Sequence, residues 1–343
     1  MDTEDRITVP NAQPGHRFPR SRTLRSRFRN RGAASLPLRG HAARPSPGRT
    51  LGRFGASFAT FAVVGATLLV PAPASAQPQP CAPATVTTAV AARIPLLDRS
   101  DNVGLDAAGN LWVSRVFRNV VERYDPAGNL TASVPVTFPG TIRPGPDGML
   151  YVNFGNLITS ALLRTGGVVR FDPTAPAPVP EVFVDGIGMT NGAAFDRDGN
   201  LYVTDADGGI ARVRPDGSVD TEWTAAAPQT AGFHGVAVHD DSLYVTVASG
   251  PTGRVLRLPI ADPEATTPVA DLTAGPGDVV LGPDDLLYVT TRAGRLVRVD
   301  PTGAGACAID SPQPITAVAL SAGTDPAVFA GTETGDVQRI RLG

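Results

Sequence analysis

Asp196-Arg-Asp-Gly-Asn-Leu-Tyr-Val203 is the clearest copy of an element that recurs six times in this chain. Each copy begins with Asp, Gly or Asn residues that suit a tight turn, and continues with apolar residues that suit a strand. The copies start about 40 to 50 residues apart, which is the spacing of propeller blades. The repeat therefore predicts an all-β fold, a six-bladed β-propeller. The other copies occupy residues 106–113, 145–152, 239–245, 282–289 and, in a degraded form, 321–330.

Each repeat contains several short apolar segments, so we expect blades of four antiparallel strands. In the third repeat the expected strands are residues 191–196, 200–205, 209–214 and 218–223. The last repeat ends after its third strand, whereas the β-prone residues 85–94 precede the first repeat and belong to none. We therefore expect this N-terminal segment to complete the last blade and close the ring. No segment has a sustained helical period, so almost no α-helix is expected.

The first 76 residues have the composition of an export signal. Twelve arginines precede an apolar run at residues 58–70, which leads to Ala74-Ser-Ala76. A basic region, an apolar core and a small-residue cleavage site are typical of a secretory signal peptide. The run is shorter than the about 20 residues that span a membrane. We expect residues 1–76 to be removed and residues 77–343 to form a secreted, monomeric propeller with no membrane span; an uncleaved anchor is the alternative.

The charge of the predicted mature chain limits its partners. The sequence has 30 basic and 32 acidic residues, of which 12 and 3 lie in residues 1–76, so 18 basic and 29 acidic residues remain, a net charge of −11. An acidic body without a basic stripe is a poor nucleic-acid binder, and we expect a small-molecule substrate or ligand instead. The chain contains no Lys, which excludes mechanisms that depend on a lysine Schiff base or nucleophile.

The two cysteines fit the expected ring closure. Cys81 precedes the closing segment, and Cys307 lies in the expected outer strand of the fifth blade. Two cysteines in an exported protein indicate a disulfide. We therefore predict a Cys81–Cys307 bond, with two unpaired thiols as the alternative.

The inner strand of each blade begins at one face of a propeller, beside the central channel. The position five residues before each turn is therefore the place to look for functional side chains. Asp, Asn and His at these positions carry oxygen and nitrogen donors toward one axis, where they can hold a divalent cation. The six aligned positions are Asp101, Gly140, Asn191, His234, Gly277 and Thr316.

One segment, Met189-Thr-Asn-Gly-Ala-Ala-Phe-Asp-Arg-Asp-Gly-Asn-Leu-Tyr-Val-Thr-Asp205, resembles the Asn-Gly blade motif of the senescence-marker-protein/gluconolactonase family. Members are six-bladed propellers that hold a divalent cation, often calcium, at the top of the channel, and many hydrolyse lactones. The resemblance implies a cation held by Asp101, Asn191 and His234: calcium, or else zinc, magnesium or manganese. Asn191 matches a ligand Asn of the family, Asp101 replaces its Glu, and His234 replaces its Asp. The family's second ligand Asn has no counterpart here.

On this resemblance we expect cation-dependent attack on a lactone or ester, with Asp101 and His234 as catalytic residues. His234 is also a candidate general base in its own right. The alternative for His234 is a hydrogen bond to a neighbouring blade. An alternative function is a non-catalytic propeller that binds a ligand or a protein and has lost the metal site, and a third is a lyase that uses His as its base.

Four further polar residues are predicted to bind the substrate: Arg143, Asn153, Asp205 and Asp278. For Arg143 the alternative is a salt bridge between blades, and for the two acidic residues it is a role in loop capping. The loop at residues 153–167 is longer than its counterparts and apolar, so it is expected either to form a lid over a pocket or to pack on its neighbour.

Overall fold

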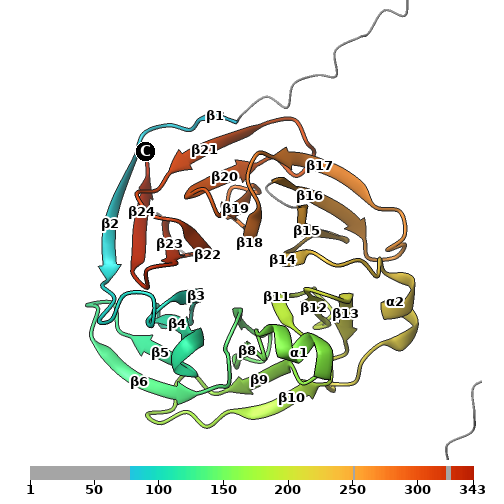
Figure 1. Cartoon of the computed structure of the whole chain (residues 1–343), viewed down its shortest axis with the longest axis horizontal. Coiled ribbons are helices and arrows are strands. Elements are labelled where there is room, and N and C mark those ends of the chain that lie inside the picture. Colours follow the sequence, from blue (N-terminus) through green and yellow to red (C-terminus); the bar gives the residue numbers. More distant parts are fainter. Residues whose placement is uncertain (1–77, 250–251, 322–325) are drawn as a thin grey trace, which may run out of the picture. The chain divides into compact units, whose positions relative to one another are not determined.

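Six antiparallel sheets follow one another along the chain and lie around a common axis, which confirms the predicted six-bladed propeller (Figure 1). The computed structural model describes residues 78–249, 252–321 and 326–343, all within one compact unit, Leu69–Gly343. The predicted signal segment, residues 1–76, lies outside the described residues. Among the described residues, no helix is long and apolar enough to cross a membrane.

The strands of each blade run in chain order from the axis outward. The first blade comprises β3 (Ser100–Leu105), β4 (Leu111–Arg115), β5 (Val120–Tyr124) and β6 (Leu130–Pro135). The second comprises β7 (Ile142–Pro144), β8 (Leu150–Phe154), β9 (Gly167–Phe171) and β10 (Glu181–Asp185). The third comprises β11 (Thr190–Phe195), β12 (Leu201–Asp205) and β13 (Gly209–Val213).

The last three blades follow the same order. The fourth comprises β14 (Phe233–His239), β15 (Ser242–Ser249), β16 (Thr252–Pro259) and β17 (Thr267–Leu272). The fifth comprises β18 (Pro276–Leu281), β19 (Leu287–Thr291), β20 (Arg295–Val299) and β21 (Ala306–Asp310). The sixth comprises β22 (Ile315–Leu320), β23 (Ala327–Thr332) and β24 (Val337–Leu342), with the N-terminal β2 (Ala84–Val90) as its outer strand.

The ring closes as the sequence predicts. β2 pairs antiparallel with β24, so the N-terminal segment completes the last blade. The short β1 (Gln79–Pro80) pairs parallel with β21 of the fifth blade. Beside this pair, Cys81 and Cys307 form the predicted disulfide, which joins residues 226 apart in the sequence.

The recurring turn and strand have a common local cause. In the third blade, Oδ1 of Asp196 accepts hydrogen bonds from the backbone N–H groups of Asp198 and Asn200, which holds the turn. Oδ2 of the same Asp196 accepts the hydroxyl hydrogen of Tyr202, so the turn also fixes the aromatic ring of the strand that follows. Gly199 takes a φ of 82°, which a residue with a side chain rarely adopts.

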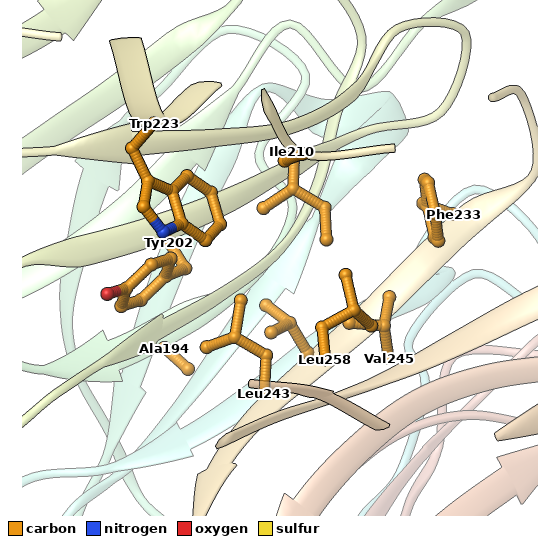
Figure 2. Close-up of a cluster of buried hydrophobic side chains, with 10 residues drawn as sticks. Ala194, Tyr202, Ile210, Trp223, Phe233, Leu243, Val245 and Leu258 are labelled. Carbon is orange, nitrogen blue, oxygen red and sulfur yellow. The ribbon is translucent and has the colours of Figure 1, made fainter. Parts of the chain in front are cut away.

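The Leu-Tyr-Val triplet is apolar at consecutive positions because both faces of a blade are buried. Leu201 and Val203 pack in a cluster with the second blade, whereas Tyr202 packs in a cluster with the fourth. Figure 2 shows the second of these clusters, in which the rings of Tyr202 and Trp223 lie beside each other. Six such clusters occupy the six interfaces between neighbouring blades. The core is therefore distributed around the ring.

The predicted fourth strand of the third blade, residues 218–223, is wrong. The segment instead forms the helix α2 (Thr221–Ala226), and only an isolated bridge between Val213 and Val219 extends the sheet. The side chain of Asp220 accepts from the N–H of Trp223 and caps the helix, while an Ala-rich sequence supports helical turns. The Trp223 indole N–H donates to Ile260 O of the fourth blade, which fixes the helix at the outer edge.

Two further helical segments of the described residues follow second strands. The 3₁₀ turn η1 (Val116–Arg118) follows β4, and α1 (Ile158–Leu163) lies between β8 and β9. α1 occupies the long loop that the sequence singles out at residues 153–167.

Candidate functional site

A cavity of about 370 Å³ lies where the inner strands of the six blades begin, and residues of all six blades line it. Of the six aligned sequence positions, five line this cavity: Asp101, Asn191, His234, Gly277 and Thr316. The alignment succeeds because each inner strand follows the same path from the axis to the turn. We call this space the mouth cavity.

The floor of the mouth cavity is a buried polar cluster. Asp278 accepts hydrogen bonds from Arg143 Nη2 at 2.7 Å and from Asn102 Nδ2 at 3.1 Å. It also accepts from the backbone N–H of Val279 at 3.0 Å and of Val318 at 3.3 Å. Both oxygens of this carboxylate are therefore engaged by protein groups from four blades.

The same cluster separates the mouth cavity from a second cavity at the other end of the channel. Asp278 lines the mouth cavity, whereas Arg143 lines the second one, so their ion pair lies between the two. The second cavity has a volume of about 350 Å³, and among its lining residues Arg143 alone has a polar side chain.

His234 and Asn191 contact each other on the wall of the mouth cavity. Nδ2 of Asn191 lies 3.2 Å from Nδ1 of His234. Burial, together with the positive charge of Arg292, lowers the pKa of His234 to about 4. The imidazole is therefore neutral at pH 7. With Nδ1 accepting the amide hydrogen of Asn191, the ring hydrogen is on Nε2.

Asp101 is held at the same mouth by two neighbours. Its Oδ2 accepts a hydrogen bond from Nδ2 of Asn156 at 2.6 Å, and its Oδ1 lies 3.6 Å from Nη2 of Arg99. Burial raises the pKa of Asp101, and the charge of Arg99 and the hydrogen bond from Asn156 offset only part of that effect. Asp101 therefore takes up a proton more readily than an ordinary aspartate does.

The predicted substrate-binding residues are dispersed. Asp278 lines the mouth cavity, but its oxygens are engaged in the floor cluster. Arg143 forms the inter-blade salt bridge that the sequence offers as its alternative. Asn153 is buried and donates to the carbonyl groups of Asn191 and Gly192, which fixes the backbone beneath the site. Asp205 accepts from backbone N–H groups, as a loop-capping residue does.

Some lining residues are absent from the sequence-based site. Glu333 immediately follows the second strand of the sixth blade, and Arg99 immediately precedes β3. The loop after each second strand opens on the mouth, so the position that follows β23 is the signal that could have identified Glu333, as the position after β19 identifies Arg292. Asn156 lies in an irregular loop, and no repeat position identifies it.

The donor set at the mouth does not fit a calcium ion. Calcium takes ~6–8 oxygen ligands, usually with several carboxylates, whereas Asp101 is the only carboxylate among the three expected ligands. Its oxygens already face Asn156 and Arg99, and a second guanidinium, that of Arg292, lines the same cavity. Within residues 78–249, 252–321 and 326–343, no group of three or more His, Cys, Asp or Glu residues could hold a metal ion.

Comparison with known proteins gives a short sequence match and a broad structural one. Residues 269–299, which extend from β17 to β20, match the family model described as strictosidine synthase-like, N-terminal. No curated protein matches the sequence of this chain.

The fold is similar to that of several solved propellers. A gluconolactonase from Xanthomonas campestris has a TM-score of 0.58 at 16% identity, covering 78% of this chain and 97% of that one. A PQQ-bound aldose sugar dehydrogenase from Streptomyces coelicolor has a TM-score of 0.56 at 19% identity, covering 76% and 99%. A virginiamycin B lyase from Staphylococcus aureus has a TM-score of 0.54 at 12% identity, covering 76% and 100%. The predicted resemblance to gluconolactonase-like propellers therefore holds for the fold.

Proposed function

We propose that this protein hydrolyses a small lactone or ester in the mouth cavity. The observation that carries the proposal is that Asp101 and His234 line one cavity. Burial raises the pKa of Asp101, which makes it a better proton acceptor. Burial lowers the pKa of His234, which keeps it neutral and able to donate a hydrogen bond. The volume of about 370 Å³ is within the range of small-molecule sites, ~300–1,000 Å³. The similarity in fold to a gluconolactonase is consistent with this reaction class.

His234 is the group that polarises the carbonyl. A neutral imidazole with its hydrogen on Nε2 can donate a hydrogen bond to a carbonyl oxygen while it keeps its proton. Asn191 fixes this tautomer through Nδ1. Arg292 lowers the pKa of His234 by its charge and lines the same cavity, so its guanidinium also stabilises the oxyanion that forms.

Asp101 is the general base. A water molecule attacks the carbonyl carbon, and Asp101 takes one proton from that water. The bond between the carbonyl carbon and the leaving oxygen then breaks, and Asp101 returns the proton to the leaving alkoxide. A lactone and one water thus give one hydroxy acid, with no oxidant or reductant consumed.

The scheme uses only side chains of this chain and has no step through calcium, because the donor set does not fit that ion. Cation dependence, which the sequence resemblance implies, is a separate outcome of the test below. We further propose that the protein acts outside the cytoplasm, as a signal segment implies. The Cys81–Cys307 disulfide supports this location, because disulfides persist in oxidising compartments.

The test is hydrolysis of lactones and aryl esters by the full chain, with and without EDTA. Two substitutions at His234 distinguish its roles, since the amide nitrogen of Gln lies near the position of Nε2 and that of Asn near Nδ1. We expect His234→Gln to retain part of the activity and His234→Asn to lose ~10²–10³-fold in kcat/KM. Asp101→Asn should lose ~10²–10⁴-fold.

The matched control is His239→Asn at the other end of the same strand, β14, which should leave kcat/KM unchanged. Loss of activity in EDTA and its return with a cation would replace this scheme with the metal-dependent one. Binding of the compounds without turnover would replace it with the non-catalytic binding propeller.

A further inference from the structure

The mouth cavity has two chemically different sides. The apolar lining comes largely from the first three blades, through Val116, Phe117, Leu157, Ile158 and Met189. The charged lining comes from the last two blades and from the residues at the start of β3, through Arg99, Asp101, Asp278, Arg292 and Glu333. The reactive groups therefore lie beside an apolar wall.

Two large side chains of the apolar wall are open to solvent. Phe117 in η1 is 50% exposed and Ile158 in α1 is 65% exposed. Both also line the mouth cavity. A ligand that occupies the cavity can therefore remove apolar surface from water at these two positions, which is favourable in proportion to the area covered.

The apolar wall is fixed in place by contacts on both sides of α1. Before the helix, Gly155 N–H donates to Thr137 O, and Asn156 donates to Asp101. At the end of the helix, Nη1 of Arg164 lies 3.7 Å from Oδ2 of Asp205 in the third blade. Figure 1 shows α1 over the second blade, beside β8. These contacts hold the α1 part of the wall in the position at which it lines the cavity, which reduces the ordering cost of binding there.

We propose that this wall is a binding subsite for the hydrophobic acyl, alkyl or aryl substituent of the substrate, so that the preferred substrates are amphipathic lactones or esters. The inference rests on the proposed function for the reacting group, but the subsite itself is defined by Phe117 and Ile158. A sugar lactone would place hydroxyl groups against Phe117 and Ile158, whose side chains offer no hydrogen-bond partners.

The experiment measures binding independently of hydrolysis. Lactams, whose amide resists hydrolysis, are titrated into the full chain by calorimetry with linear alkyl substituents of increasing length. Full burial of a methylene strengthens binding by up to about fourfold. We expect the dissociation constant to fall about two- to fourfold per methylene until the wall is covered, and then to level off.

Variants locate the effect. Phe117→Ser and Ile158→Ser should flatten the dependence on chain length while the shortest lactam binds as before. The matched control is Leu162→Ser in the same helix, since Leu162 is 80% exposed but does not line the cavity. It should leave the dependence unchanged. Far-UV circular dichroism confirms that each variant is folded.

Two failures are distinguishable. A chain-length dependence that Phe117→Ser abolishes, in a protein that hydrolyses nothing, would retain the subsite and remove the proposed hydrolase. Hydrolysis or lactam binding that is independent of chain length, or a complete lack of lactam binding, would overturn the subsite. The same holds if Leu162→Ser flattens the dependence as strongly as Ile158→Ser does.

Discussion

Substitution of Arg115 by Met should weaken the interface between the first and the sixth blade and so lower the free energy of unfolding. Arg115 lies on β4 of the first blade and is 1% exposed. Its Nη1 donates to Asp98 O at 2.7 Å and to Gly335 O, in the sixth blade, at 2.5 Å. Its Nε donates to Glu122 Oε2 at 2.9 Å. One side chain therefore ties the first blade to the last.

The expected cost follows from what the substitution leaves behind. Glu122 is also 1% exposed, and its pKa lies below the ordinary value: burial alone would raise it, but hydrogen bonds from Tyr124 and Arg115 prevail. Removing one partner of a buried ion pair costs about 3–5 kcal/mol. Because Tyr124 and the guanidinium groups of Arg93 and Arg118 still contact Glu122, we expect a value no higher than the lower limit, about 3 kcal/mol.

The assay is equilibrium unfolding in urea, followed by tryptophan fluorescence. The matched control is Arg254→Met, which breaks an exposed pair with Asp271 and should cost less than about 1 kcal/mol. The double variant Arg115→Met/Glu122→Leu should recover part of the loss, since the buried carboxylate that loses Arg115 is then removed as well. A loss for Arg115→Met that equals that of Arg254→Met would refute the reasoning.

Three further predictions concern the closure and the two titratable groups. Cys81→Ser/Cys307→Ser should destabilise the protein by at most about 5 kcal/mol, since the bond closes a loop of 226 residues; unchanged urea midpoints would show that strand pairing alone closes the ring. Because Asp101 acts ionised and its pKa is raised, kcat/KM should fall on acidification with a midpoint above the ordinary value of about 3.9; a midpoint at or below that value would exclude it as the base. By NMR, the imidazole signal that disappears in His234→Asn should titrate near pH 4. Since folding lowers this pKa, the stability that neutral His234 retains above about pH 6.5 should be lost as the pH falls toward 4; a midpoint near 6.5 would contradict the burial argument.

The fold was predictable because its signal is local. In the repeat, one carboxylate such as Asp196 holds the turn and the hydroxyl of Tyr202 together, within six residues. The same strand buries Leu201 on one face and Tyr202 on the other, so the apolar triplet persists in every blade. Closure by the N-terminal strand followed from counting strands, and the disulfide followed from the two cysteines placed beside that closure; both predictions are confirmed.

The helix α2 was missed because its signals are capping and tertiary contacts. Asp220 and the following Ala-rich segment favour a helix, but the β-prone run at residues 218–223 suggests a strand by periodicity alone. The ring centroids of Trp223 and Tyr202 lie 5.1 Å apart, and the indole N–H of Trp223 donates to Ile260 O. These two contacts stabilise the helix over the strand. These partners come from another strand and another blade, which the local pattern does not specify.

The position of the site was predictable from the sequence, but the hydrogen-bond and ion-pair partners of its residues were predictable only in part. Register along the inner strands brings Asp101, Asn191 and His234 to one cavity, as alignment predicts. Arg143 lies in the second blade and Asp278 in the fifth, and the two residues are 135 positions apart in the sequence. No spacing rule within a repeat contains that information. The roles of all these residues in binding or catalysis stay predictions.

The most direct measurement of the central claim is a crystal structure of the full chain with a bound lactam. The account predicts that the lactam carbonyl oxygen lies about 2.7–3.1 Å from Nε2 of His234, the distance of a polarising donor, within the mouth cavity and with no cation between them. A carbonyl oxygen coordinated by a metal that Asp101, Asn191 and His234 hold, or a lactam bound only in the cavity at the other end of the channel, would contradict it.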